Sequence, residues 1–300
     1  MTHIIHTIVV LAVFAVAGLP EQAIAQGKFN PFPIKLEPFK PVPKEVLTAW
    51  KDAGTEFGWL SGLYLPKLLY RPDAPNKGAF AAPTFRVIRW PDNVAKLPDP
   101  GVPFGLYLTN TRVTDENLKE LAHLKSLHVL SLMYTGLTDK GMKELVVFQN
   151  LHVLDLLETH IGDYGMKHIA QITSLRALRP SEQITGEGLK EVGKLKNLWG
   201  LELYQVRKIS GAGLKGLAGL KLKWLSLPPE AKTDIGLKHY LSAVETPTQL
   251  NLTTWNITDT GLKELHGQTS LKSLTLRAVK VSDAAVAELR DALPGCKIIR

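Results

Sequence analysis

The feature that most constrains this chain is a phrase repeated every 23–25 residues over its C-terminal two-thirds. The phrase reads Thr-Asp-x-Gly-Met-Lys-Glu-Leu at residues 138–145 and Thr-Asp-x-Gly-Leu-Lys-Glu-Leu at residues 258–265, its clearest forms. A second phrase, Leu-x-x-Leu-x-Leu, lies between the copies, as at residues 127–132. A fixed period of this length indicates a repeat architecture, in which each unit buries its apolar face against the next.

Each repeat is expected to contain one short strand and one helix. The alternation at the end of the leucine phrase predicts a strand with Leu130 and Leu132 facing inward and Ser131 facing out. The Thr-Asp pair then supplies a helix N-cap and a negative charge at the positive helix end. Eight copies of this helix start are present, at Val113, Leu137, Ile161, Ile184, Ile209, Thr233, Ile257 and Val281.

A glycine recurs in the first turn of these helices, where it costs about 1 kcal/mol relative to alanine. Its repeated use predicts a close approach of neighbouring helices. The positions are Gly141, Gly165, Gly188, Gly213, Gly236 and Gly261.

Residues 104–300 resemble leucine-rich-repeat proteins, in the style of ribonuclease-inhibitor-like proteins, F-box substrate adaptors and secreted bacterial repeat proteins. The resemblance implies an α/β fold, a right-handed solenoid with parallel strands on the concave face and helices on the convex face. Nine strands about 4.8 Å apart make a sheet roughly 38 Å long. The family usually has asparagine after the strand, whereas this chain has Thr111, Thr135 and Thr159. We therefore expect the turns to be held differently.

The N-terminus carries the features of an export signal. Residues 4–19 are apolar but too short to span a bilayer comfortably, and Ala23-Ile-Ala25 gives the small-x-small pattern of signal-peptidase sites. Residues 1–25 are therefore interpreted as a signal peptide cleaved before Gln26, which leaves no membrane span and predicts a periplasmic, cell-envelope or extracellular protein. The segment before the apolar run has no Lys or Arg, so an uncleaved anchor stays open as an alternative.

The rest of the chain divides by composition. Residues 26–43 alternate proline with apolar residues and predict an extended arm. Residues 44–103 are expected to form an irregular N-terminal cap, residues 104–283 an array of about eight 24-residue repeats, and residues 284–300 a C-terminal cap. Cys296 is aligned with Leu271 and is expected to be a buried, unreactive thiol.

One repeat departs from the pattern. The segment Leu175-Arg-Ala-Leu-Arg-Pro180 places proline where the last inward leucine is expected. Proline has no N–H to donate to a neighbouring strand. The sequence therefore predicts a shortened strand and a local irregularity near residues 179–183.

The outward residues of the strands are the candidate binding residues. Arg179 lies between Asp155 and Glu202 on neighbouring strands, which predicts either cross-strand pairing of these charges or a polar site for a charged partner. Flanking apolar residues predict a contiguous patch for a protein or peptide, unless the arm at residues 26–43 covers it. The predicted partner-binding residues are Tyr107, Met133, Tyr134, Asp155, Leu157, Arg179, Glu202, Tyr204 and Trp224.

No pattern predicts a catalytic, cofactor or metal site. His128 and His152 lie one repeat apart, but no third metal ligand shares their register. Ser131 lies on a regular strand without the sharp turn of a hydrolase nucleophile. The single cysteine excludes an intramolecular disulfide.

The net charge of +8 arises largely from one lysine per repeat, with glutamates beside most of them. Aromatic residues do not alternate with these lysines, which argues against nucleic acid as a partner. The leading hypothesis is an exported, non-enzymatic repeat protein that binds a protein or peptide on its concave face. Two alternatives stay open: an F-box-like adaptor that uses residues 42–47, and an envelope-structural or anionic-polysaccharide-binding role for the basic convex face.

Overall fold

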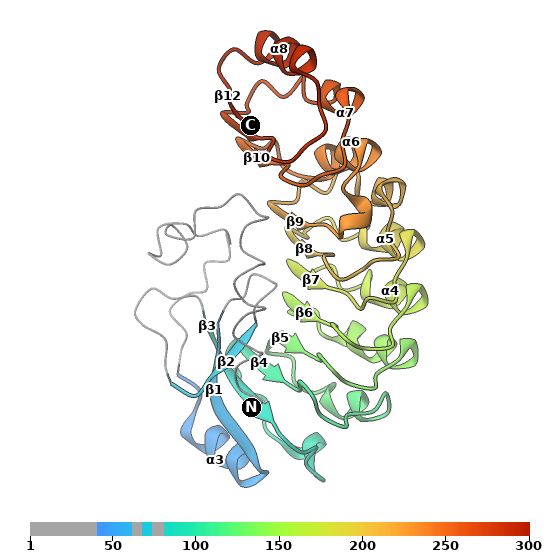
Figure 1. The fold of residues 1–300 in the computed structure, drawn as a ribbon. Coiled ribbons are helices and arrows are strands. Elements are labelled where there is room, and N and C mark those ends of the chain that lie inside the picture. Colours follow the sequence, from blue (N-terminus) through green and yellow to red (C-terminus); the bar gives the residue numbers. More distant parts are fainter. Residues whose placement is uncertain (1–40, 62–67, 74–80) are drawn as a thin grey trace, which may run out of the picture.

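The computed structural model describes residues 41–61, 68–73 and 81–300 (Figure 1). The signal peptide at 1–25 and nearly all of the arm at 26–43 lie outside the described residues, and both stay predictions. Among the helices of the described ranges, none has the length and hydropathy to cross a membrane.

In its described residues, the cap contains one α-helix, the short 3-10 helix at Val94–Lys96 and three antiparallel strands. Helix α3 (Lys44–Asp52) buries Val46 and Trp50 in the main core. Strand β1 (Thr55–Ser61) pairs with β2 (Leu69–Arg71) on one side and β3 (Ala81–Val87) on the other.

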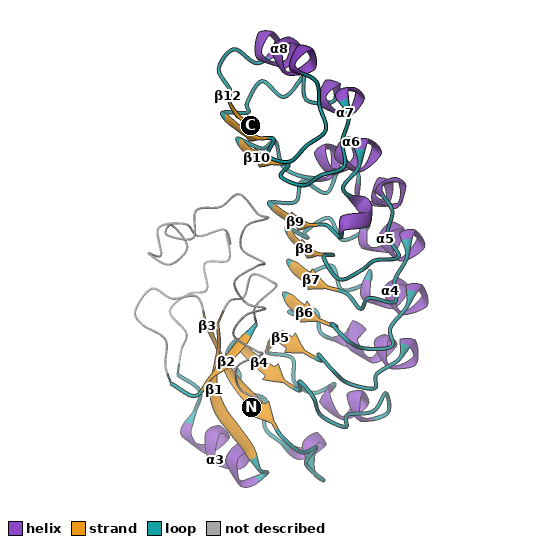
Figure 2. Cartoon of the chain, in the orientation of Figure 1, coloured by secondary structure: helices purple, strands orange, loops and turns teal. Residues whose placement is uncertain are grey.

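Parallel pairing begins at β3 and continues strand by strand along the repeats (Figure 2). The strands line one side of the stack and the helices the other, which confirms the predicted α/β arrangement. The array strands of the first sheet are β4 (Phe104–Tyr107), β5 (Leu127–Ser131), β6 (Val153–Asp155), β7 (Ala177–Arg179), β8 (Gly200–Glu202) and β9 (Trp224–Ser226). A separate sheet contains β10 (Gln249–Asn251), β11 (Ser273–Thr275) and β12 (Lys297–Ile299).

The helical layer mixes two helix types. The α-helices are α4 (Asp163–Ile169), α5 (Gly186–Val192), α6 (Asp234–Ala243), α7 (Asp259–Lys263) and α8 (Asp283–Ala292). The 3-10 helices are η2 (Val94–Lys96), η3 (Asn117–Leu121), η4 (Asp139–Val147), η5 (Gly211–Leu217) and η6 (Pro229–Ala231). Hydroxyl side chains cap several N-termini, as when the Thr185 Oγ1 accepts the N–H of Glu187.

Buried threonines hold the turns after the first array strands. The hydroxyls of Thr111, Thr135 and Thr159 each donate to the carbonyl three residues earlier, at 2.7, 2.7 and 2.6 Å. A threonine hydroxyl that bonds within its own turn thus takes the place of the asparagine that is usual in leucine-rich-repeat proteins. The turns are held differently, as expected.

The recurring glycines make room for an aspartate of the preceding repeat. The Asp163 carboxylate accepts the N–H groups of Thr185 and Gly188, at 2.8 and 2.9 Å. A Cβ on Gly188 would lie 2.5 Å from that Asp163 oxygen. Asp163 is the first residue of α4 and Gly188 lies in α5, so the glycine permits the predicted close approach of neighbouring helices, and Gly141, Gly165 and Gly261 likewise meet a carboxylate of the preceding repeat.

Pro180 has the expected effect on strand pairing but not on strand length. β7 keeps three residues, as β6 and β8 do, so the predicted shortening is wrong. β6 and β7 pair at three positions, whereas β7 and β8 pair at two. The reason is the missing donor: Leu156 N bonds to the Arg179 carbonyl at 2.8 Å, and Pro180 has no N–H for the corresponding bond one repeat later.

The larger break separates β9 from β10, so the expectation of one continuous sheet of nine array strands is wrong: β4 to β9 belong to one sheet and β10 to β12 to another. The pair Leu250–Leu274 aligns Pro247 with Leu271, so proline replaces the first leucine of that repeat. In the next repeat Lys272 N donates to the Thr248 carbonyl at 2.7 Å. Among the described residues no such bond joins Thr248 to Lys223, and the sheet divides here.

The expected burial of Cys296 is wrong. The pair Ser273–Lys297 places Cys296 beside Lys272 rather than Leu271. The thiol is half-buried against the core, and burial raises its pKa.

Candidate interaction surface

An apolar cluster covers the first strands of the array on their outward face. Val129, Val153 and Ala177 are buried there, together with Trp199. Leu60 of β1 and the residue Leu68 before β2 belong to the same cluster, so the cap packs onto the start of the strand face. The half-buried residues packed against the cluster are Tyr70, Tyr107 and Trp224.

Asp155 and Arg179 form a buried ion pair across β6 and β7. The Arg179 Nε donates to Asp155 Oδ1 at 2.7 Å, and Nη2 contacts the second carboxylate oxygen. The two residues are 0% and 5% exposed. Burial raises the pKa of Asp155, and the guanidinium opposes that shift. The sequence left open whether Asp155 and Arg179 pair across the strands or form a polar site for a charged partner. The geometry is that of cross-strand pairing.

A second charged pair of residues lies beside Tyr204. Glu202 is buried and accepts the Tyr204 N–H at 2.8 Å. Lys232 is also buried, and its ammonium lies 5.9 Å from the centroid of the Tyr204 ring. Burial raises the pKa of Glu202 and lowers the pKa of Lys232. The negative charge of Glu202 opposes the second shift, because it stabilises the charged form of Lys232.

Sequence reasoning missed Lys232, which comes from the link between η6 and α6 rather than from a repeated position. The only signal was the unrepeated segment Pro228-Pro-Glu-Ala-Lys232.

The outward apolar residues differ in accessibility. Tyr134 and Tyr204 are 50% and 40% exposed, whereas Met133 and Trp224 are half-buried. Leu157 is 4% exposed. The expectation that Met133, Leu157, Tyr204 and Trp224 form one accessible surface is therefore wrong at Leu157, which belongs to the interior.

His128 and His152 are in contact, with ring centroids 4.8 Å apart and the rings nearly perpendicular. Burial, followed by the charges of His128 and Arg176, lowers the pKa of His152 to about 4. No group of three His, Cys, Asp or Glu side chains in the described part of the chain is arranged to hold a metal ion.

The lowered pKa of His152 predicts that the free energy of unfolding falls in mild acid. The folded-state pKa of His152 is below its unfolded value of 6.5, so its contribution is complete above pH 6.5 and falls as the pH drops toward 4. Because the ring is partly exposed, we expect about 1 kcal/mol over this window. Urea unfolding at several pH values measures it. His152→Gln should flatten the profile, and the exposed His160→Gln should leave it unchanged; equal profiles for all three proteins would exclude His152 as the source.

The stacked parallel strands on one side, the helices on the other and the leucine repeat of about 24 residues give the fold of a leucine-rich-repeat solenoid.

Among solved structures, the chain is similar to an internalin (inlF) of Listeria monocytogenes, at 23% identity and a TM-score of 0.43 over 65% of this chain. The match spans 53% of that internalin chain, about half its length. Internalin C2 of the same organism gives 23% identity and a TM-score of 0.36 over 65% of this chain and 69% of its own. A leucine-rich-repeat protein of Leptospira interrogans gives 17% and 0.32, over 65% and 72% of the two chains. Neither a protein-family model nor a curated protein matches the sequence.

Proposed function

We propose that this chain is an exported, non-enzymatic repeat scaffold that binds a protein or peptide partner on its strand side, at a surface formed by Tyr204, Trp224 and Lys232. The observation that carries the proposal is the Tyr204 ring. It is 40% exposed and lies beside two buried charged residues, Glu202 and Lys232. Glu202 fixes the backbone of Tyr204, and Lys232 lies against its ring. A tyrosine held in one orientation loses little entropy on binding, and tyrosine is enriched among residues that dominate binding energy.

Two observations disfavour the alternative partners. Several lysines of the helix side pair with glutamates, as Lys190 does with Glu187 at 2.6 Å, which reduces their availability to an anionic polysaccharide. Val42 and Val46 of the F-box-like segment are buried in the core, so two of its three aliphatic side chains are not accessible to another protein.

Export rests on the signal pattern at residues 1–25, and the non-enzymatic assignment on the repeat sequence, in which no pattern predicts a catalytic site. N-terminal sequencing of the protein from a fractionated cell tests the export step: cleavage before Gln26 supports it, and an intact N-terminus in the cytosol contradicts it.

Substitution of Tyr204 by alanine should weaken partner binding by about 2 kcal/mol, roughly thirtyfold. The matched control is Tyr164→Ala, because Tyr164 is 60% exposed on α4, on the helix side. Both variants should unfold at nearly the wild-type denaturant concentration, since both rings lie largely outside the core. Partners captured from envelope extract by the full chain are identified and then titrated against the three proteins.

Retention of binding in high salt would fit an apolar and aromatic contact, because salt screens exposed charges. Equal affinity of the Tyr204→Ala variant and wild type, or selective loss in Tyr164→Ala, would contradict the strand-side proposal.

A further inference from the structure

The strand next to the end of the first sheet, β1, is covered by the edge strand β2 over only part of its length. β2 pairs with the second half of β1, from Trp59–Arg71 to Ser61–Leu69. Residues 55–58 of β1 pair with β3 on the opposite side. Along these four residues no described strand pairs with the outer edge of β1, although Gly58 lies close against Tyr70 and Arg71 of β2.

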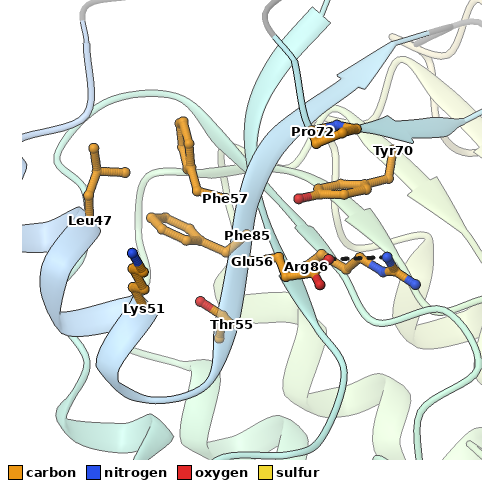
Figure 3. A pocket seen from close by; sticks show the side chains of 9 residues that line it. All are labelled: Leu47, Lys51, Thr55, Glu56, Phe57, Tyr70, Pro72, Phe85 and Arg86. Atoms are coloured by element: carbon orange, nitrogen blue, oxygen red, sulfur yellow. Dashed lines mark hydrogen bonds and ion pairs between the residues drawn. The ribbon is translucent and has the colours of Figure 1, made fainter.

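A pocket of about 740 Å³ lies beside this part of β1 (Figure 3). Leu47 and Lys51 of α3 line it together with Phe57. Glu56 and Arg86 line it from the opposite face of the sheet, since successive residues of a strand point to opposite faces. A pocket lined from both faces of one strand lies at the edge of that strand, in the position that an added strand would occupy. Its volume is within the range of ligand sites, roughly 300–1,000 Å³.

The two sides of this edge pocket differ in chemistry. On the α3 side, Phe57 is 36% exposed although its ring packs against Phe85 at 5.5 Å. Lys51 is exposed on the same side, and no ion pair of Lys51 is found in the described part of the chain. On the other side the Arg86 guanidinium is already held by Glu56 at 3.1 Å. The pocket therefore offers an apolar contact and a cation side by side.

We propose that residues 55–58 of β1 are a strand-addition site for an extended peptide segment of a partner protein. The peptide pairs its backbone with β1 and extends the sheet past the end of β2, a common mode of peptide recognition. Residues i and i+2 of the peptide point to the α3 side. The complementary pattern is an apolar residue against Phe57, then any residue, then an acidic residue beside Lys51.

The shape of the site favours a peptide over the edge of a second copy of this chain. β2 and Pro72 close one end of the pocket, and α3 closes one side. Four residues of strand span about 13 Å, enough for a short segment and too little for another folded sheet edge with its own cap. The site lies in the cap and is independent of the surface at Tyr204.

The probe is a fluorescein-labelled octapeptide, Thr-Thr-Val-Thr-Asp-Thr-Thr-Thr with blocked ends, titrated against the full chain by fluorescence anisotropy. Saturable binding is expected, and Lys51→Glu should weaken it at least about tenfold, because reversal of the charge repels the acidic residue. Lys140→Glu reverses an exposed lysine of η4 and should leave the affinity unchanged. A peptide N-methylated at alternate amides should not bind, because it lacks the donors that pair with a strand edge.

Hydrogen exchange locates the binding site. The peptide should slow exchange at the residue 55–58 amides that face the open edge, with no change at β9 or β10. Three results would overturn the proposal: no saturation at about 1 mM peptide, equal binding by the N-methylated peptide, or protection outside β1. A concentration-dependent dimer that protects residues 55–58 without peptide would also overturn it, by placing a second copy at this edge.

Discussion

Replacement of Arg179 by alanine is expected to lower the free energy of unfolding by about 3–5 kcal/mol, because it leaves a buried carboxylate without its cation. Asp155 is 0% exposed, and the guanidinium makes two contacts to it. Arg86→Ala is the matched control: its ion pair with Glu56 is exposed on both sides and should contribute less than about 1 kcal/mol. Chemical denaturation of the three proteins at neutral pH measures both effects.

Two further measurements separate the broken ion pair from the lost contacts of a long side chain. Without Arg179, the pKa of Asp155 should rise further, since burial already raises it and the guanidinium opposes that rise. Because a raised pKa lets Asp155 take up a proton as the solution is acidified, the deficit should become smaller as the pH is lowered from 8. The double variant Asp155→Leu with Arg179→Met should recover most of the lost stability. A deficit that is independent of pH and unchanged in the double variant would contradict the charge argument.

The repeat period predicted the fold because it acts on every unit in the same way. Leu130 and Leu154 occupy one position, face one core and pair with each other. Thr111 and Thr135 likewise repeat one turn bond. Pro180 was interpretable for the same reason, since a missing donor at a repeated position removes one known bond.

Features that occur once were not predictable from the repeat. Pro247 breaks the pattern as Pro180 does, but it precedes the strand, where its effect depends on the alignment of a repeat with one extra residue. Burial of the outward strand residues depends on the cap, whose Leu60 and Leu68 lie on the strand face. Lys232 reaches Tyr204 from a segment without a counterpart in the other repeats. The candidate site therefore combines strands that the repeat predicts with contacts, such as that of Lys232 with Tyr204, that the repeat spacing does not predict.

The change from aspartate to glycine in the middle repeats allows a test of how the solenoid is held together. At Gly186 and Gly211 the bridging aspartate is absent, and α5 packs closely against η5. A Cβ on Gly193 would lie 2.0 Å from the Gly216 carbonyl oxygen, a backbone atom that cannot rotate away.

Gly193→Ala should therefore force α5 and η5 apart and lower the free energy of unfolding by about 1–3 kcal/mol. Gly267→Ala is the control, because its new Cβ would meet nothing within 4 Å and its backbone is not in the left-handed region; it should be neutral or slightly stabilising. Since a solenoid is held together by contacts between neighbouring repeats, the damage should concentrate at this interface. Hydrogen exchange should then show faster opening of α5 and η5 than of α8. Equal stability of the two variants would mean that the middle repeats tolerate a wider spacing, and that the glycines there are not needed for packing.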